Sequence, residues 1–377
     1  MKIDPFEMER YQSLHWHVVD YDLSESGVLP MTIRELLGPA ADAEAFIAGT
    51  WLGYPLSEGS LETRTNIASW YPEAEASNAT VVNGGSEANF LALWSLLGGG
   101  DRLAFMVPNY LQGRGLGRAF GAATDTFRLR PSDNGWALDT DELKDAVGKR
   151  TKAVMVCNPN NPTGHVLTED EMDAVVAAAD RVGAWIVADE IYRGAELDTD
   201  EASPTFFGRY DKVIVTGGLS KAFAMPGLRI GWAVSTPPMI HRIWARHDYT
   251  TLAPSMVSDR LAALAMLPDV RESILTRTRT IIRANYPSLE AWLRSHDDIF
   301  TWSRPDAGAI AYARYDLPIS SSKLAERVRE DRSVLLVPGS MFGLKKGLRF
   351  GFGYDIEHTL KGLALVDEVL QEVRADP

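Results

Sequence analysis

The chain has 377 residues, 45% of them hydrophobic and 24% charged, which is typical of a globular protein with about two domains. Its formal net charge of −13 argues against binding to a nucleic-acid backbone, which requires a basic face. The single cysteine, Cys157, excludes an intramolecular disulfide and fits a reducing compartment. Because we find neither a signal-peptide pattern nor an apolar run of membrane-spanning length, we predict a cytoplasmic protein with no membrane or nucleic-acid partner.

The N-terminal segment predicts a helix over residues 4–14, since Asp-Pro favours a helix start. Residues 15–23 read as extended, which would place His15 and His17 on one strand face. Two histidines could contribute to a metal site, but no third ligand stands at a suitable spacing, so we predict no metal site. A turn follows at 24–28, and Ser60 is a suitable N-cap for a later helix.

From Ala79 onward the chain alternates between strand and helix patterns. This alternation predicts a three-layer α/β/α large domain with a mostly parallel, seven-stranded sheet. The expected strands are 79–82, 102–107, 124–129, 151–157, 183–188, 213–218 and 228–234, and the expected helices are 83–97, 111–120, 139–148 and 169–182.

After Val234 the pattern changes to a long helical stretch, 255–296, and then to a smaller α+β region. The expected strands of that region are 299–302, 310–313, 334–337 and 348–352, and its helices are 321–331 and 356–373. We therefore predict an N-terminal arm that also joins the small domain (1–47), a large domain (48–247) and a small C-terminal domain (248–377).

Polar clusters follow three of the predicted strands, at 83–87, 158–164 and 189–192. The carboxyl ends of parallel strands meet at one edge of a sheet, so we expect these clusters to lie together. The first combines a strand, a glycine turn and a helix start, which can bind an anion through backbone N–H groups. The later run 113–117 is superficially similar to a dinucleotide-binding loop, but it follows no strand directly, and we reject that reading.

Lys221 lies between two apolar runs that read as buried strands. An unpaired ammonium is costly away from water, and burial is expected to lower the pKa of this lysine and make it a nucleophilic amine suited to Schiff-base chemistry. The alternative is an ordinary lysine in a surface loop.

Four features together decide between these alternatives. They are Asn-Pro-Asn-Asn-Pro-Thr-Gly at 158–164, Asp-Glu-Ile-Tyr at 189–192, Ser220-Lys221, and Arg229 eight residues after the lysine. In this order and spacing the chain resembles the aspartate aminotransferase superfamily (class I/II aminotransferases) of fold-type-I pyridoxal-phosphate enzymes. The resemblance covers nearly the whole chain and implies pyridoxal 5'-phosphate as the cofactor.

The resemblance implies roles for residues around the cofactor ring. Lys221 would form the Schiff base with the cofactor and later move the proton at the substrate Cα. Asp189 would pair with the ring nitrogen and keep it protonated. Tyr192 and Asn161 would hydrogen-bond the phenolic oxygen of the ring, and Tyr110 would stack on it.

The resemblance also implies how the cofactor phosphate is bound. The matching residues are Gly85, Ser86, Glu87, Ser220 and Arg229. Tyr54 matches a tyrosine that the neighbouring subunit donates to the phosphate, which implies a homodimer.

Three residues are expected at the substrate. Arg349 matches the arginine that grips the substrate α-carboxylate, whereas the alternative is a buried arginine with a structural partner. Asn161 would contribute beside it. By analogy the turn at Gly27 should border the substrate. By the same analogy His15, His17 and Glu25 are candidate specificity determinants, and the sequence assigns them no chemical role.

The sequence departs from the family pattern in two ways. Gly218 stands where the family often has a phosphate-binding serine or threonine, and we identify no second arginine for a dicarboxylate side chain, which argues against aspartate or glutamate as the main substrate. Segments 25–28, 218–223 and 248–252 resemble capreomycidine-synthase-like enzymes of specialised metabolism, which use the cofactor for chemistry at Cβ and Cγ.

The function implied is a pyridoxal-phosphate enzyme that acts on an α-amino acid through an external aldimine and a Cα carbanion (quinonoid), most simply an aminotransferase. The alternative is β- or γ-elimination, γ-replacement or cyclisation, which could use a substrate with a γ leaving group such as S-adenosylmethionine. A third reading, a regulator that senses an effector through an aminotransferase-like domain, normally needs a DNA-binding module, and we find no basic helix-turn-helix segment before residue 50.

Overall fold

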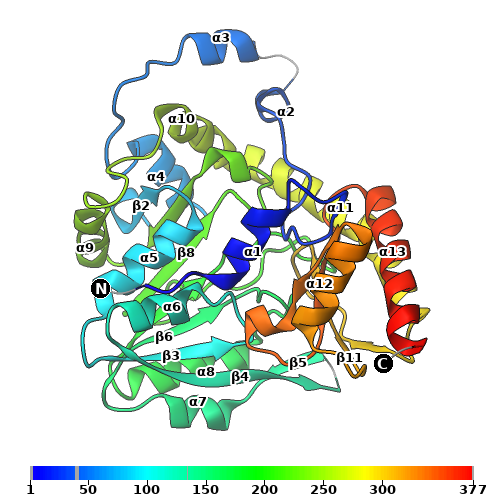
Figure 1. Ribbon diagram of the computed structural model, residues 1–377. Helices are drawn as coiled ribbons and strands as arrows, with labels where there is room; N and C mark the ends of the chain where they lie inside the picture. The colour runs from blue at the N-terminus through cyan, green and yellow to red at the C-terminus, as the bar shows by residue number, and fades with distance from the viewer. Residues whose placement is uncertain (1–2, 39–41, 134, 376–377) are drawn as a thin grey trace.

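The computed structural model describes residues 3–38, 42–133 and 135–375 (Figure 1). Its largest sheet has, among these residues, eight strands in the order β2-β9-β8-β7-β6-β3-β4-β5. Strands β8, β7, β6, β3 and β4 run parallel, whereas β9 is antiparallel to both of its neighbours and β5 is antiparallel to β4. The bounds are β2 (Ala79–Val82), β3 (Arg102–Val107), β4 (Ala123–Ser132), β5 (Gly135–Leu138), β6 (Thr151–Cys157), β7 (Trp185–Asp189), β8 (Val213–Gly218) and β9 (Gly231–Val234).

The mostly parallel sheet confirms the predicted fold class, with one addition. The seven expected strands are present, and β5 is an eighth strand at the edge beyond β4. A four-residue edge strand that follows a turn is too short to show a clear alternation of apolar residues, which is why the sequence did not indicate it.

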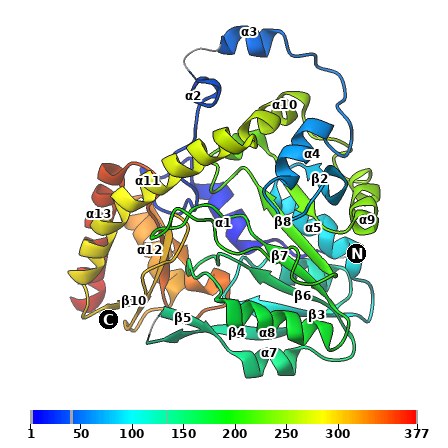
Figure 2. The same cartoon turned by 180° about the vertical axis from the view of Figure 1, so that it is seen from behind.

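Helices cover both faces of this sheet (Figures 1 and 2). On β6, Ala153 and Met155 pack into a core with helices of one face, and Val154 and Val156 pack into the core of the other, as the two-residue period of a strand requires. The first face carries α5 (Gly85–Leu96), α6 (Gln112–Ala119) and α9 (Pro237–His247). The second carries α4 (Leu61–Ala68), α7 (Thr140–Ala146) and α8 (Glu169–Asp180).

A smaller region is built around an antiparallel sheet of order β10-β11-β14-β13. A separate parallel pair joins β1 near the N-terminus to β12, with Tyr21 opposite Val334. The domain boundaries stay a prediction, and this pairing supports the joining of the N-terminal arm to the small domain. The bounds are β1 (Tyr21–Asp22), β10 (Phe300–Trp302), β11 (Ile310–Tyr315), β12 (Val334–Leu335), β13 (Val337–Pro338), β14 (Leu348–Gly351), α12 (Ser321–Arg332) and α13 (Ile356–Ala375).

Two expectations about helices were wrong. The first helix, α1 (Glu7–His15), includes His15 and is followed by a turn, so His15 and His17 do not share a strand face. The expected helical stretch 255–296 is two helices, α10 (Met256–Ala265) and α11 (Pro268–Arg294). Pro268 has no backbone N–H to continue α10, but it is well suited to the first turn of a new helix.

The segment that connects β1 to α4 carries two short helices that the sequence did not indicate. It contains α2 (Ile33–Leu37), capped by Thr32, and α3 (Ala43–Ala48), capped by Asp42. Both views show α3 projecting away from the rest of the molecule (Figures 1 and 2). Three short 3₁₀ helices complete the described elements: η1 (Ala76–Asn78), η2 (Pro226–Leu228) and η3 (Gly339–Phe342). None of the described helices is both long and apolar enough to cross a membrane.

Candidate active site

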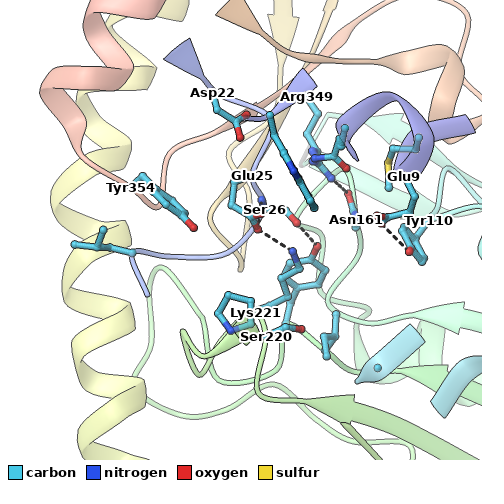
Figure 3. Close-up of a pocket in the computed structure, with 18 of the residues that line it drawn as sticks. Glu9, Asp22, Glu25, Ser26, Tyr110, Asn161, Ser220, Lys221, Arg349 and Tyr354 are labelled. Carbon is cyan, nitrogen blue, oxygen red and sulfur yellow. Dashed lines mark hydrogen bonds and ion pairs between the residues drawn. The ribbon is translucent and has the colours of Figure 1, made fainter. Parts of the chain in front are cut away.

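A cavity of about 1530 Å³ lies beyond the carboxyl ends of the parallel strands, between the large sheet and the small region. Figure 3 shows side chains from the N-terminal segment, the large sheet and β14 converging on it. The sequence-predicted residues that line it are Gly85, Ser86, Tyr110, Asn161, Asp189, Tyr192, Ser220, Lys221, Arg229 and Arg349.

Lys221 follows β8 and enters this cavity from the loop between β8 and η2. Its Nζ lies 2.8 Å from Oε1 of Glu25, and Figure 3 shows the two side chains pointing toward each other. Burial by itself would lower the pKa of Lys221, but the Glu25 carboxylate and the Tyr192 phenol together outweigh burial, so that the pKa is raised. The expectation of a lowered lysine pKa was therefore wrong for the cofactor-free chain, because sequence reasoning had not placed a carboxylate beside it.

Glu25, a candidate specificity determinant by analogy, lines the cavity and contacts the reactive lysine. Its Oε1 accepts hydrogen bonds of 2.8 Å from the backbone N–H groups of Ser26 and Gly27, as well as the one from Lys221. Burial would raise the pKa of this carboxyl, yet Lys221 and the two N–H groups lower it to about 2. A single glutamate in a turn carries no sequence signal for such a contact, because its partner is 196 residues away.

Asp189 ends β7 and points into a buried polar chain at the base of the cavity. Asn89 on α5 donates a 2.7 Å hydrogen bond to its Oδ2, and Thr216 on β8 donates one of 2.7 Å to Oδ1 of Asn89. Burial raises the pKa of Asp189, and the hydrogen bond from Asn89 opposes that effect. Sequence reasoning missed Asn89. The one indication in the sequence was an amide side chain within an otherwise largely apolar helix.

Two tyrosines border the cavity. Tyr192 is buried and donates a 3.0 Å hydrogen bond to Oγ of Ser26, and burial raises the pKa of its phenol. Tyr110 donates a 2.8 Å hydrogen bond to Oε1 of Glu9, so that α1 closes over this side of the cavity. Phe6 packs edge-on against the Tyr110 ring, with 4.7 Å between the ring centroids.

Arg349 lies on β14, 1% exposed, and faces the cavity together with Asn161. Its Nη1 donates a 2.9 Å hydrogen bond to Oδ1 of Asn161, and its Nη2 donates one to the carbonyl oxygen of Ser24. Its Nε has no hydrogen-bond partner among the described residues. The guanidinium therefore has structural partners at Nη1 and Nη2. Because a buried donor without a partner is costly, Nε would gain from donating a hydrogen bond to a bound anion.

The start of α5 forms the opposite end of the cavity. Its N-cap, Gly84, contributes no side-chain cap, so the first N–H groups of the helix, at Gly85 and Ser86, remain available. Arg229, in the left-handed conformation with φ of +52°, packs so close that any Cβ on Gly84 would clash with its guanidinium. A helix N-terminus beside a guanidinium is a favourable site for a phosphate.

Glu87, in contrast, is turned away from the cavity lining. Its carboxylate accepts hydrogen bonds from the Asn83 N–H (2.6 Å) and from the hydroxyls of Thr250 and Thr251 (2.5 and 2.8 Å), and it lies 3.5 Å from Nε2 of His247. These contacts tie the start of α5 to the end of α9.

Gly218, where the sequence departs from the expected phosphate-binding serine or threonine, lies in a tightly packed position. A Cβ there would lie 2.9 Å from the Ile230 carbonyl oxygen and 3.0 Å from Cδ1 of Ile191. A serine or threonine would not fit without displacing the backbone of the neighbouring strand.

Two other predicted site residues lie outside the lining. Gly27 packs against the stem of Lys221, where a Cβ would be 3.7 Å from Cδ of the lysine. Tyr54 is 83% exposed on the segment before α4, beside a second hollow of about 680 Å³ that Arg229 also borders.

Comparison with known proteins identifies the family. Residues 20–363 match the family of aminotransferases of class I and II. The chain belongs to this family. It is 30% identical to capreomycidine synthase of Streptomyces vinaceus over 93% of this chain and 89% of that protein. It is 26% identical to an aspartate aminotransferase of Streptomyces avermitilis over 85% of this chain and 81% of that protein.

Solved structures agree with this assignment. A PLP-dependent aminotransferase from Streptococcus suis superposes with a TM-score of 0.91 at 28% identity and covers 99% of both chains. The PLP-dependent cyclase OrfR superposes with a TM-score of 0.87 at 28% identity, over 99% of this chain and 98% of that chain. The family resemblance inferred from the motifs is confirmed, and the chain is a pyridoxal-phosphate-dependent enzyme of the aminotransferase family.

The residues present fit this cofactor. Pyridoxal 5'-phosphate carries a phosphate, a basic ring nitrogen and an aldehyde. The cavity holds an anion-binding helix start with Arg229, the buried carboxylate of Asp189 and the amine of Lys221. The chemistry of these three groups complements the three parts of the cofactor.

Proposed function

We propose that this enzyme is an aminotransferase that binds the α-carboxylate of its amino acid substrate through Arg349. The observation that carries this proposal is that Lys221 and Arg349 line one cavity, while Arg349 Nε has no partner among the described residues. Bound pyridoxal phosphate would supply an electron sink for the negative charge that develops at the substrate Cα.

Each residue around the ring then has a specific task. Asp189 would hold a proton on the ring nitrogen, and Lys221 would carry the proton between substrate and cofactor carbons. Asn161 uses Oδ1 to accept the hydrogen bond from Arg349, which leaves Nδ2 as its donor toward the phenolic oxygen of the ring. Tyr192 would donate to the same oxygen, and Tyr110 would stack on the ring.

The phosphate would be bound by the N–H groups of Gly85 and Ser86 together with Ser220 and Arg229. Glu87 would contribute through its backbone, because its carboxylate is engaged elsewhere.

We also propose a homodimer in which Tyr54 reaches the neighbouring site. The support is that Trp51, Leu52 and Tyr54 are 70%, 82% and 83% exposed on one projecting segment, an apolar exposure that a partner subunit would cover. The mass of the purified enzyme in solution tests this proposal; a monomeric mass with bound cofactor would contradict it.

The arginines of the cavity lining limit which amino acids are expected as substrates. Arg229 and Arg349 are the arginines that line the cavity among the described residues. With Arg229 at the phosphate and Arg349 at the α-carboxylate, the described part of the lining offers no further arginine for a second carboxylate, which favours substrates other than aspartate and glutamate. Gly27, against the stem of Lys221, would border the substrate.

Elimination, replacement or cyclisation at Cβ or Cγ is the second candidate function. It is supported by the similarity to capreomycidine synthase and to the cyclase OrfR. The shared first step, removal of the Cα proton, uses the same residues in both candidates.

One experiment distinguishes the two candidates. The enzyme is mixed with a panel of amino acids, and the cofactor spectrum and the products are followed together. Stoichiometric pyridoxamine phosphate with a keto acid supports transamination, whereas regeneration of the cofactor with release of a leaving group supports elimination, replacement or cyclisation. No cofactor change with any amino acid would contradict both.

We further propose a cytoplasmic location and the division into 1–47, 48–247 and 248–377. The buried, single Cys157 fits a reducing compartment. The large sheet begins at Ala79 and ends at Val234, within the proposed large domain.

A further inference from the structure

Glu25 and Lys221 form an ion pair that none of the roles above requires. Their charged atoms lie 2.8 Å apart, and both side chains are about a quarter exposed (24% for Lys221 and 23% for Glu25). The pair joins the N-terminal segment to the end of the central strand β8, 196 residues further on. Charged partners of titratable groups are common at functional sites, so this contact is a candidate for a functional role.

The backbone holds the Glu25 carboxylate in place independently of the lysine. The N–H groups of Ser26 and Gly27 both donate to Oε1, and the turn that carries them packs against Ser220, whose carbonyl oxygen would lie 3.2 Å from a Cβ on Gly27. The turn is also fixed to β14, because the N–H of Gly351 donates a 2.8 Å hydrogen bond to the Leu23 carbonyl. The carboxylate of Glu25 therefore stays oriented when Lys221 changes its charge.

Other titratable groups face the pair from the surrounding elements. The positive charge of Arg349 on β14 disfavours the protonated form of Lys221 and favours the ionised form of Glu25. The phenol of Tyr192, after β7, also faces Lys221. Asp22 on β1 and Tyr354, after β14, face Glu25. Among the described residues, Glu25 is the carboxylate that contacts Nζ directly.

We propose that Glu25 is a positioning residue that fixes Nζ of Lys221 in the cavity and stabilises the protonated form of the nitrogen carried by Lys221, both as a free amine and when it is joined to the cofactor. A fixed anion within hydrogen-bond distance stabilises the charged form of a nitrogen, and the two backbone donors favour the ionised form of the carboxylate. The part that concerns the cofactor-bound state rests on the proposed function.

The first test is a pH titration of the visible absorbance of the cofactor-bound enzyme, which reports protonation of the nitrogen joined to Lys221. The variant Glu25→Gln should lower the midpoint by about 1 to 3 pH units, the effect of an opposite charge at this distance. Glu25→Asp, which keeps the charge, should restore part of the shift. The matched control is Asp22→Asn, which removes a nearby carboxylate without a contact to Lys221 and should shift the midpoint less.

A Glu25→Gln midpoint equal to that of the unchanged enzyme would overturn the proposal. It would also be overturned if Asp22→Asn moved the midpoint as far as Glu25→Gln, because the effect would then be the general charge of the cavity rather than this contact.

The second test uses the full-length chain without cofactor. Acetic anhydride modifies neutral amines, and peptide mass spectrometry gives the modification rate of Lys221 across pH. Glu25→Gln should move the rise in that rate to lower pH, by about one unit or more; identical profiles would overturn the proposal. Failure of the unchanged protein to bind pyridoxal phosphate would refute the proposed function instead, and the labelling profiles would still decide the role of Glu25.

Discussion

Nδ2 of Asn89 lies 2.7 Å from Oδ2 of Asp189, although the two residues are one hundred positions apart in the sequence. The hydrogen bond connects the second turn of α5 to the end of β7, and Thr216 orients Asn89 from the other side. It supports the ionised form of a buried carboxylate whose pKa burial raises. The charge that Asp189 would offer to the ring nitrogen thus depends on a residue that does not itself contact the nitrogen.

Replacing Asn89 by alanine should therefore weaken cofactor binding. Loss of a hydrogen bond to a charged group costs about 1.5–3 kcal/mol, which corresponds to a roughly 10- to 150-fold rise in the dissociation constant of pyridoxal phosphate. Equilibrium titration of cofactor-free protein measures the change. Asn66→Ala, which removes a 2.8 Å hydrogen bond to the Ala263 carbonyl on α10, is the control and should leave that constant unchanged.

Arg349→Lys should weaken the binding of the amino acid much more than that of the cofactor. A lysine cannot hold a carboxylate with two parallel hydrogen bonds, so we expect a loss of about 10- to 100-fold in substrate affinity. Separate titrations with amino acid and with pyridoxal phosphate give the two effects, and Arg314→Lys, an exposed position on β11, is the control. An equal loss of both affinities would mean that Arg349 has a structural role only.

Gly218→Ser should destabilise the protein instead of restoring a phosphate contact. The added side chain meets the Ile230 carbonyl oxygen at 2.9 Å, and we expect a loss of about 1–3 kcal/mol in the free energy of unfolding. Urea unfolding of cofactor-free protein measures it. Gly115→Ser, on α6 where a Cβ meets no atom within 4 Å, is the matched control. Tighter cofactor binding by Gly218→Ser would contradict the steric argument.

The contacts of His165 predict that the free energy of unfolding of the protein depends on pH. Its Nδ1 lies 3.2 Å from Asp306 and its Nε2 3.1 Å from Glu171, and although burial alone would lower its pKa, these carboxylates raise it to about 9. Because the folded pKa exceeds the unfolded value of 6.5, the stabilisation is complete below that value and is lost as pH rises through about 9.

The corresponding variant is His165→Gln. The difference in free energy of unfolding between the unchanged protein and the variant should be larger near pH 6 than near pH 10 by about 2–3 kcal/mol. Urea unfolding across that pH range measures it, with His241→Gln on α9 as the control. A difference that stays constant across the range would show that His165 does not titrate against its two carboxylates.

The sequence predicted those parts of the site that lie within short segments. Asp189 and Lys221 follow buried strands, and the topology of a parallel sheet brings such strand ends together without further information. Arg349 was assigned through the family resemblance alone, and the structure places it in the same cavity.

Contacts between distant segments could not be predicted in this way. Glu25 and Asn89 contact partners that are 196 and 100 residues away, and no motif indicates either contact. The raised pKa of Lys221 follows directly from the first of these contacts, so an argument from burial alone gave the wrong direction. The helices α2 and α3 were missed because short capped helices have little apolar periodicity.

The most direct test of the whole account is to identify the lysine that holds the cofactor. The purified enzyme is treated with borohydride, which makes the link between cofactor and lysine permanent, and its peptides are analysed by mass spectrometry. We predict one modified peptide with the cofactor on Lys221, and no modified peptide from Lys221→Ala. Cofactor attached to another lysine, or reducible absorbance that persists in Lys221→Ala, would contradict the assignment on which the proposed function depends.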